Sequence, residues 1–450
     1  MPTNTLTVDY LVIGAGAMGM AFADVLVGES ASTMAVVDRN DAPGGHWTVS
    51  YPFVRLHGPS NFYGVISRPM PSDEGTRSLA SRNEILDYYD RVMRETLLAS
   101  GRVTYLPRHH VDVAEPGRPA RARSLVTGET TEILVRKRVV DASYMNITVP
   151  AMRPAGFDVD DAATVVPINQ LAELDRSPER FTVIGAGKTG IDACLWLLER
   201  GIDPDRLTWI VPRDAWLINR ELEWQTGGFQ PLLNLLACRS TDEVISVLEE
   251  KGIVIQREPD VEPTAFRCAT VDTEELVQLR RIKNVVRLGR VRAIGATIVT
   301  LDEGTIPTTP ETVHIDCTAD GLAQKPLKPV FEDGAITLQP LLPCLLPPSA
   351  AIAARLECMD GDDEWRNGLC PPVANPGSSR DLLSFYSLRL ERMARWARSP
   401  ELFEWLVTSR FVSGAGLERM AEPDAQAAIF FFASRMEDLL KADAVVSVAG

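Results

Sequence analysis

The N-terminal stretch that decides the fold is VDYLVIGAGAMG, from Val8 to Gly19. Its first six residues predict a buried strand, and the small and apolar residues from Ala17 to Val27 predict a helix packed against a sheet. Between them the glycines follow the spacing G-x-G-x-x-G. The first makes a tight turn, the second admits a pyrophosphate to the backbone, and the third lets helix and strand pack closely. The stretch therefore predicts a Rossmann unit that binds a dinucleotide at the start of its helix.

An acidic residue follows at the distance that such a site requires. A second strand is predicted at Met34–Val37, and Asp38 ends it, nineteen residues after Gly19. Asp38 is expected to accept hydrogen bonds from a ribose of the AMP half. We assign to this first site Gly14, Gly16, Ala17, Met18, Gly19, Asp38 and Arg39.

The same arrangement occurs again in the middle of the chain. A strand at Phe181–Ile184, the run GAGKTG at 185–190 and a helix at Ile191–Arg200 precede a strand at Leu207–Val211. Arg213 then stands roughly where the first unit has its acid, and an arginine there meets a ribose 2′-phosphate, which favours NADP over NAD. The alternative for Arg213 is a surface ion pair with Asp214 or Glu221. We assign to the second site Gly185, Gly187, Lys188, Thr189, Gly190 and Arg213, with Lys188 either touching phosphate or solvated.

Composition and charge exclude several classes of function. Of the 450 residues, 45% are hydrophobic and 24% charged, as in an ordinary globular protein of two or more domains. The formal net charge of −15 argues against nucleic acid and anionic membranes as partners and favours small molecules. No apolar run approaches the ~20 residues of a membrane span, and the N-terminus has no export signal, so we expect a cytoplasmic protein. No set of His, Asp, Glu or Cys residues has metal-ligand spacing.

Further elements are predicted outside the two glycine units. We expect a helix at Arg82–Leu98, and an amphipathic helical stretch from Ser379 to Leu406 that either packs on the domains or binds a partner or membrane surface. The predicted strands are Val103–Leu106, Ala122–Val126, Glu132–Val135, Arg138–Asp141 and Thr312–Asp316.

The segment after Asp38 carries a resemblance to a known family. Gly44-Gly45-His46-Trp47 is a G-G-x-W run, and Tyr51-Pro52 followed by Arg55 is similar to a Y-P-x-x-R run. With the two glycine motifs in this order, the chain resembles the class B flavin monooxygenases, which include the flavin-containing and Baeyer–Villiger monooxygenases. The resemblance implies FAD in the first domain and NADPH in the second, with Gly45, His46 and Trp47 at the FAD.

The resemblance also implies an α/β fold of two nested Rossmann-like domains, the NAD(P) domain inserted into the FAD domain. VVDAS at 139–143 and HIDCTADG at 314–321 look like the strand ends where the chain passes between the domains. A helix after Pro347-Pro348 would turn its positive N-terminal end to the flavin. We expect residues 1–165 to begin the FAD domain, 166–320 to form the NAD(P) domain, and 321–450 to return to the FAD domain and add C-terminal helices.

The seven cysteines are scattered and form no closely spaced pair. We therefore expect reduced thiols, as in a cytoplasmic protein. A flavin disulfide reductase passes its electrons through two closely spaced thiols, so this pattern argues against that class.

The activity implied by the resemblance is NADPH-dependent oxidation of a small organic substrate by O2 through a C4a-peroxyflavin. Arg55 would stabilise negative charge on the flavin, His57 would donate a proton, and Asn61 would lie near the oxygen-reactive face. The alternatives are an ion pair for Arg55 and a packed histidine for His57.

One hallmark of the family is absent from this chain. The F-x-G-x-x-x-H fingerprint has no counterpart before Gly185, where Phe157 and the residues after it include no histidine. Two other functions therefore stay open: an NAD(P)H dehydrogenase or reductase without oxygenation, and a non-catalytic module that senses redox state. The sequence also leaves open the substrate and whether the chain forms a homo-oligomer.

Overall fold

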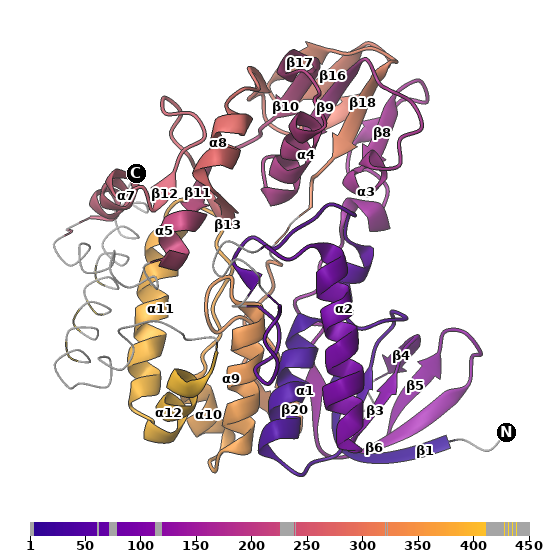
Figure 1. Ribbon diagram of the computed structural model, residues 1–450, viewed down its shortest axis with the longest axis vertical. Helices are drawn as coiled ribbons and strands as arrows, with labels where there is room; N and C mark the ends of the chain where they lie inside the picture. The colour runs from indigo at the N-terminus through magenta and orange to yellow at the C-terminus, as the bar shows by residue number, and fades with distance from the viewer. Residues whose placement is uncertain are drawn as a thin grey trace.

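Two helix-covered parallel sheets form the framework of the computed structural model, one above the other in Figure 1. The structure describes residues 4–60, 63–71, 79–112, 119–225, 238, 240–319, 321 and 323–410, and the single positions 427, 431, 434 and 438. Both sheets are parallel around their glycine loops, as the α/β prediction requires.

The lower sheet has the strand order β19-β20-β6-β1-β2-β3. These strands span Phe331–Glu332, Ala335–Thr337, Thr130–Asp141, Asn4–Ile13, Met34–Val37 and Val103–Leu106. Because β20 pairs in parallel with β6, the chain returns to its first sheet after completing the second unit. The nested arrangement predicted from the sequence is therefore confirmed.

Helix α1 (Ala17–Glu29) is apolar on nearly every side, with Asp24 its buried polar residue. Its residues from Met18 to Leu26 are buried, because the helix lies between the sheet and α9 (Leu346–Cys358). Helix α9 begins slightly earlier than predicted, with Pro347 and Pro348 in its first turn, where a missing N–H costs no hydrogen bond.

The upper sheet has the order β14-β10-β9-β18-β8, and all its pairs are parallel. The strands span Asn284–Val286, Leu207–Ile210, Arg180–Ile184, Thr312–Asp316 and Thr164–Pro167, and α4 (Lys188–Glu199) follows β9. Two small sheets extend this unit. The first contains β11 (Ala215–Asn219), β12 (Val254–Ile255) and β13 (Ala265–Val271), and the second contains β7 (Asp158–Val159), β15 (Val291–Ile294), β16 (Ile298–Leu301) and β17 (Gly304–Pro307).

Several predicted elements differ in detail. Helix α2 (Arg82–Val92) passes into a π-helical turn at Met93–Leu97, and the two strands expected between Glu132 and Asp141 are one continuous β6. β5 (Ala120–Ser124) ends before Val126 and pairs with β4 (His109–Asp112). The remaining helices are α3 (Ile168–Leu171), α5 (Arg220–Gln225), α7 (Thr241–Glu250), α8 (Thr273–Leu279) and α10 (Asp363–Leu369).

The C-terminal helical stretch is two helices rather than one. Helix α11 (Asp381–Ala397) ends before α12 (Pro400–Thr408) begins. Pro400 has no N–H and disfavours helical geometry at the residue before it, so the helix cannot run through Ser399. Both helices pack on the molecule. Among the described residues, no helix is both long and apolar enough to cross a membrane.

The expectation of seven reduced cysteines is wrong. Cys268 and Cys344 form a disulfide with their Cα atoms 6.6 Å apart, although 76 residues separate them in sequence. Cys268 lies in β13 and Cys344 lies shortly before α9, so only the tertiary structure brings them together. The other five cysteines are free.

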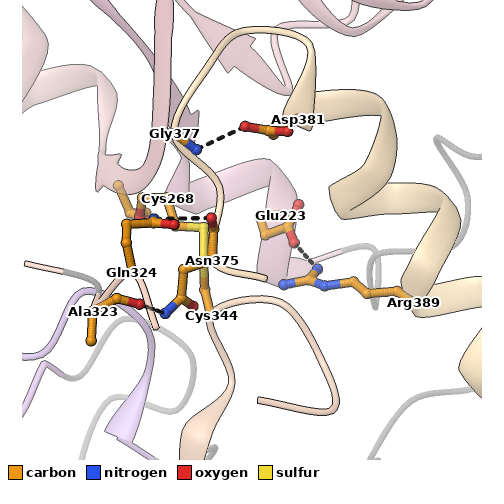
Figure 2. Close-up of a disulfide and its surroundings, with 10 residues drawn as sticks. Glu223, Cys268, Ala323, Gln324, Cys344, Asn375, Gly377, Asp381 and Arg389 are labelled. Carbon is orange, nitrogen blue, oxygen red and sulfur yellow. Dashed lines mark hydrogen bonds and ion pairs between the residues drawn. A yellow bond between two sulfur atoms is a disulfide. The ribbon is translucent and has the colours of Figure 1, made fainter. Parts of the chain in front are cut away.

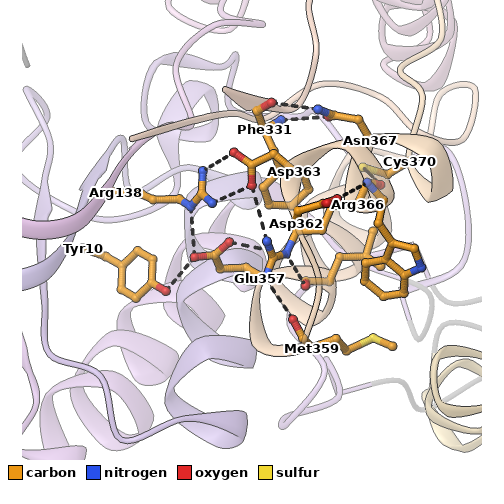
Figure 3. Close-up of polar contacts among 12 residues, drawn as sticks. Tyr10, Arg138, Phe331, Glu357, Met359, Asp362, Asp363, Arg366, Asn367 and Cys370 are labelled. Carbon is orange, nitrogen blue, oxygen red and sulfur yellow. Dashed lines mark hydrogen bonds and ion pairs between the residues drawn. The ribbon is translucent and has the colours of Figure 1, made fainter. Parts of the chain in front are cut away.

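A partly buried group of charges ties the returning segment to the first sheet (Figure 3). From β6, the Arg138 guanidinium donates to both Asp363 oxygens, at 2.9 and 2.6 Å, and to Glu357 at 3.2 Å. The Tyr10 hydroxyl of β1 donates to Glu357 at 2.8 Å. Helices α9 and α10 are therefore fixed to the strands that carry the first glycine loop.

Candidate functional site

The first glycine loop follows β1 and opens α1, as predicted. Gly14 has a φ of +105°, and a Cβ atom at Gly19 would collide with the carbonyl oxygen of Gly14. Gly16 is the N-cap of α1 and leaves the first N–H groups of the helix without a side-chain cap. Ala17 is half-buried and Met18 is buried at the start of the helix. The loop has the close strand–helix packing of a dinucleotide cradle.

The G-G-x-W run folds back over this loop. Gly44 donates its N–H to the Ala15 carbonyl at 2.8 Å, and Gly45 has a φ of +57°. A Cβ atom on Gly45 would lie 2.7 Å from the Cα of Gly16, so two glycines are needed where the segments cross. The Trp47 indole is buried and donates to the Tyr63 hydroxyl at 2.7 Å, whereas His46 is exposed.

Asp38 is buried at the carboxyl end of β2. Its carboxylate accepts the N–H of Ala15 at 2.5 Å and that of Asn40 at 2.7 Å. Burial raises the pKa of Asp38, and these two hydrogen bonds oppose the increase. The carboxylate is thus held beside the glycine loop, while the neighbouring Arg39 is exposed.

The second glycine loop repeats the geometry of the first. Gly185 has a φ of +116°, and a Cβ atom at Gly190 would collide with the carbonyl oxygen of Gly185. Gly187 is the N-cap of α4, is exposed, and has no heavy atom within 4 Å of the position of a Cβ atom. This loop therefore presents open space at the N-terminus of its helix.

The Y-P-x-x-R run crosses from the first unit to the second. The Tyr51 hydroxyl donates to Asp192 of α4 at 2.6 Å, and the Phe53 ring stacks on Trp196 with centroids 4.8 Å apart. Lys188 forms an ion pair with the same Asp192, and Thr189 hydrogen-bonds Tyr51. Burial, followed by the charge of Asp192, raises the pKa of Tyr51 well above its usual range.

Arg213 is exposed just beyond β10, and among the described residues it forms neither of the predicted ion pairs, with Asp214 or with Glu221. Asp214 instead pairs with Arg287 at 2.7 Å and lies 3.6 Å from Arg257. Glu221 accepts a hydrogen bond from Thr273.

Arg257 lines a small cavity of about 20 Å³ next to the second glycine loop. Its guanidinium lies over the Trp209 ring, 5.0 Å from the centroid, and only 6% of the residue is exposed. Ala186 of the glycine loop and Asp214 also line this cavity. Arginines from three segments therefore gather where the second unit's strands end.

The three catalytic candidates have different environments. Arg55 is exposed, and its guanidinium donates to the Leu79 carbonyl at 3.0 Å. The His57 ring donates a hydrogen bond to the Cys268 carbonyl. The backbone carbonyl of His57 accepts a hydrogen bond from the Arg220 guanidinium at 2.9 Å. Burial lowers the pKa of His57 well below its usual range, and the charges of Lys188 and Arg220 lower it further. Asn61 lies outside the described residues.

Sequence reasoning missed several residues of this region. Tyr51 enters the sequence analysis only through the Y-P-x-x-R run, and Phe53 fills one of its unspecified positions, so their contacts with α4 have no local signal. Nor does any spacing connect Arg257 or Arg287 with Asp214, because they come from different loops.

Comparison with known proteins places the chain in a family. It is 42% identical over 426 residues to uncharacterized protein Rv2000 of Mycobacterium tuberculosis and to uncharacterized protein Mb2023 of Mycobacterium bovis, covering 91% of this chain and 78% of each relative. No protein-family model matches the chain.

Two solved structures show the fold. An oxidized steroid monooxygenase bound to NADP is 14% identical, with 98% of each chain covered and a TM-score of 0.52. A cyclohexanone-bound cyclohexanone monooxygenase is 15% identical over 79% of this chain and 86% of that chain, also with a TM-score of 0.52. The chain therefore belongs to the same family as the mycobacterial protein Rv2000, and it has the fold of these flavin monooxygenases.

Proposed function

We propose that this protein is an NADPH-dependent FAD oxidoreductase, and that it acts as a monooxygenase on a small organic molecule. The observation that carries the proposal is the pair of glycine loops joined by one segment. Tyr51 reaches from the loop region of the first unit to Asp192 beside the second loop, at 2.6 Å. Two dinucleotides held on these loops would extend toward a shared interface, as hydride transfer between them requires.

The residues of the first unit fit FAD. Gly14, Gly16 and Gly19 leave backbone N–H groups facing outward at the start of α1, and Asp38 is the ribose acceptor. FAD, when bound, supplies a ring that takes a hydride from NADPH and passes electrons to oxygen. The chain's own part is to hold that ring and to exclude water.

The second unit fits NADPH. The space at Gly187 admits a pyrophosphate, and Arg213 is available for a 2′-phosphate. Arg257 and Arg287 offset the charge of Asp214, which would otherwise repel a phosphate. The steroid monooxygenase with this fold is bound to NADP, which agrees with the assignment.

An NAD(P)H reductase that does not oxygenate a substrate is the second candidate. The exposure of Arg55 favours it, because an arginine in contact with water stabilises a negative charge on the flavin less than one in a dry site. The missing F-x-G-x-x-x-H fingerprint points the same way.

Anaerobic titration followed by mixing with oxygen tests the proposal. The purified protein should be yellow, and NADPH should bleach its flavin absorbance. A monooxygenase then consumes oxygen without releasing an equal amount of hydrogen peroxide when its substrate is present, whereas a reductase or simple oxidase releases peroxide throughout. A protein that cannot be loaded with FAD would contradict the whole proposal.

A further inference from the structure

The Cys268–Cys344 disulfide lies where the two nucleotide-binding units meet. Cys268 belongs to β13 of the second unit's small sheet, and Cys344 belongs to the segment that returns to the first sheet before α9. The His57 ring, from the run that follows the first glycine loop, donates to the Cys268 carbonyl. The charge of Lys188, in the second glycine loop, helps to lower the pKa of His57.

The local backbone directs both cysteines to this position. The pairing of β11 with β13 shifts register between Trp216 and Ile218, so Cys268 lies in a β-bulge. Bulges re-aim side chains and are over-represented next to active sites. Cys268 and Cys344 have φ values of 55° and 61°, and Arg108 is the only other non-glycine residue with positive φ among those described. Such conformations cost energy and cluster at functional sites.

The two cysteine residues differ in exposure. Cys268 is 9% exposed, whereas Cys344 is partly exposed. The remaining five cysteines are dispersed, and none of them forms a second disulfide among the described residues.

The surroundings also contain an acceptor that the disulfide leaves unused (Figure 2). Asn375 is 7% exposed and donates from Nδ2 to the Ala323 carbonyl at 2.8 Å. Its Oδ1 atom is buried and has no hydrogen-bond partner among the described residues. A disulfide has no hydrogen to donate, whereas a thiol has an S–H. Reduction would therefore add a thiol donor near this unused acceptor.

We propose that Cys268–Cys344 is a redox-active disulfide that accepts two electrons originating from NADPH, giving the protein a dithiol–disulfide activity. The S–S bond breaks, each sulfur gains one electron and one proton, and NADPH becomes NADP⁺, so that NADPH, one proton and the disulfide yield NADP⁺ and two thiols. This inference rests on the proposed function, because the electrons enter through the two nucleotide sites.

Thiol counting in the FAD-loaded protein tests the inference. The protein is incubated without oxygen, with or without NADPH, while the flavin absorbance is recorded, and is then denatured in the presence of an alkylating reagent. We expect five alkylated cysteines before NADPH and all seven after it, with the two new labels on the peptides that contain Cys268 and Cys344.

Two variants serve as matched controls. Cys344→Ser should give a thiol count that NADPH does not change, because Cys268 is then free from the start. Cys358→Ser removes a free cysteine of α9 and should lower both counts equally while keeping the NADPH-dependent increase of two. If Cys344→Ser does not fold, the peptide assignment in the wild type still decides the question.

The outcomes separate this inference from the proposed function. Bleaching of the flavin with a constant thiol count would overturn the redox-active disulfide and leave the oxidoreductase intact. If NADPH neither bleaches the flavin nor exposes new thiols, both the redox-active disulfide and the proposed function are overturned.

Discussion

At the scale of single residues, Gly187 is the glycine of the second loop that has room for a side chain. We predict that Gly187→Val folds with a free energy of unfolding within about 1 kcal/mol of the wild type, the range of N-cap substitutions. It should lose NADPH binding, because the new side chain occupies the approach of the pyrophosphate. Thermal unfolding and nucleotide titration check the two parts.

Gly190→Val is the matched control in the same loop. Its Cβ atom would collide with the carbonyl oxygen of Gly185, so this variant should be poorly folded. NADPH binding by Gly187→Val at the wild-type affinity would remove the loop from the nucleotide site.

Arg213 gives a prediction about which nicotinamide is used. A bond to a charged group contributes about 1.5–3 kcal/mol, or roughly tenfold to a hundredfold in affinity. Arg213→Ala should raise the NADPH half-saturation for flavin reduction by that factor and change the NADH value little, since NADH has no 2′-phosphate. Equal losses with both nucleotides would mean that Arg213 has a structural role.

His57 predicts a pH dependence of stability. The pKa of His57 is lowered in the folded protein. Below pH ~6.5, the ordinary histidine pKa, the unfolded chain therefore binds a proton on His57 more readily than the folded protein does. The contribution of His57 to the free energy of unfolding is therefore complete above pH ~6.5 and is lost as the pH falls below it. Between pH 7 and pH 5 the wild type should lose about 2 kcal/mol more than His57→Asn.

Urea unfolding at the two pH values measures this difference. His314, whose pKa burial also lowers, is present in both proteins and cancels. Parallel pH profiles for the two proteins would show that His57 takes up a proton in the folded state.

At the scale of elements, Arg138 on β6 is the residue that fixes α9 and α10 to the first sheet. Replacing it with Met leaves Glu357 buried without its arginine partner from β6, and removal of one partner of a buried pair costs about 3–5 kcal/mol. We expect that loss in the free energy of unfolding. The double variant Arg138→Met with Glu357→Gln should recover part of it, and no recovery would mean that packing rather than charge dominates.

At the scale of the whole molecule, the hydrogen bond from Tyr51 to Asp192 links the two glycine-loop units. Tyr51→Phe keeps the ring and both glycine loops but removes a bond to a charged group of about 1.5 kcal/mol or more. We predict roughly tenfold slower flavin reduction by NADPH, with affinities for FAD and NADPH close to the wild type. Stopped-flow reduction and equilibrium titration separate the rate from binding, and an unchanged rate would show that this contact does not couple the units.

The sequence by itself determined the two Rossmann units, their order and the placing of Asp38 and Arg213 just beyond strand ends. Those features are local: a buried strand, a glycine turn and a helix follow one another within about twenty residues, and each is required by backbone sterics. Helix ends were less well predicted, because the break before Pro400 and the π-helical turn after Val92 depend on short-range backbone geometry within an otherwise helical pattern.

Only the tertiary structure decided how the units are joined. Tyr51 and Asp192 are 141 residues apart, and Cys268 and Cys344 are 76 apart. No periodicity or motif records such pairs, because each side chain satisfies its local element whether or not the distant partner is present. The insertion of one domain into the other brings these partners together, and that is why the contacts between the two units had to be seen in three dimensions.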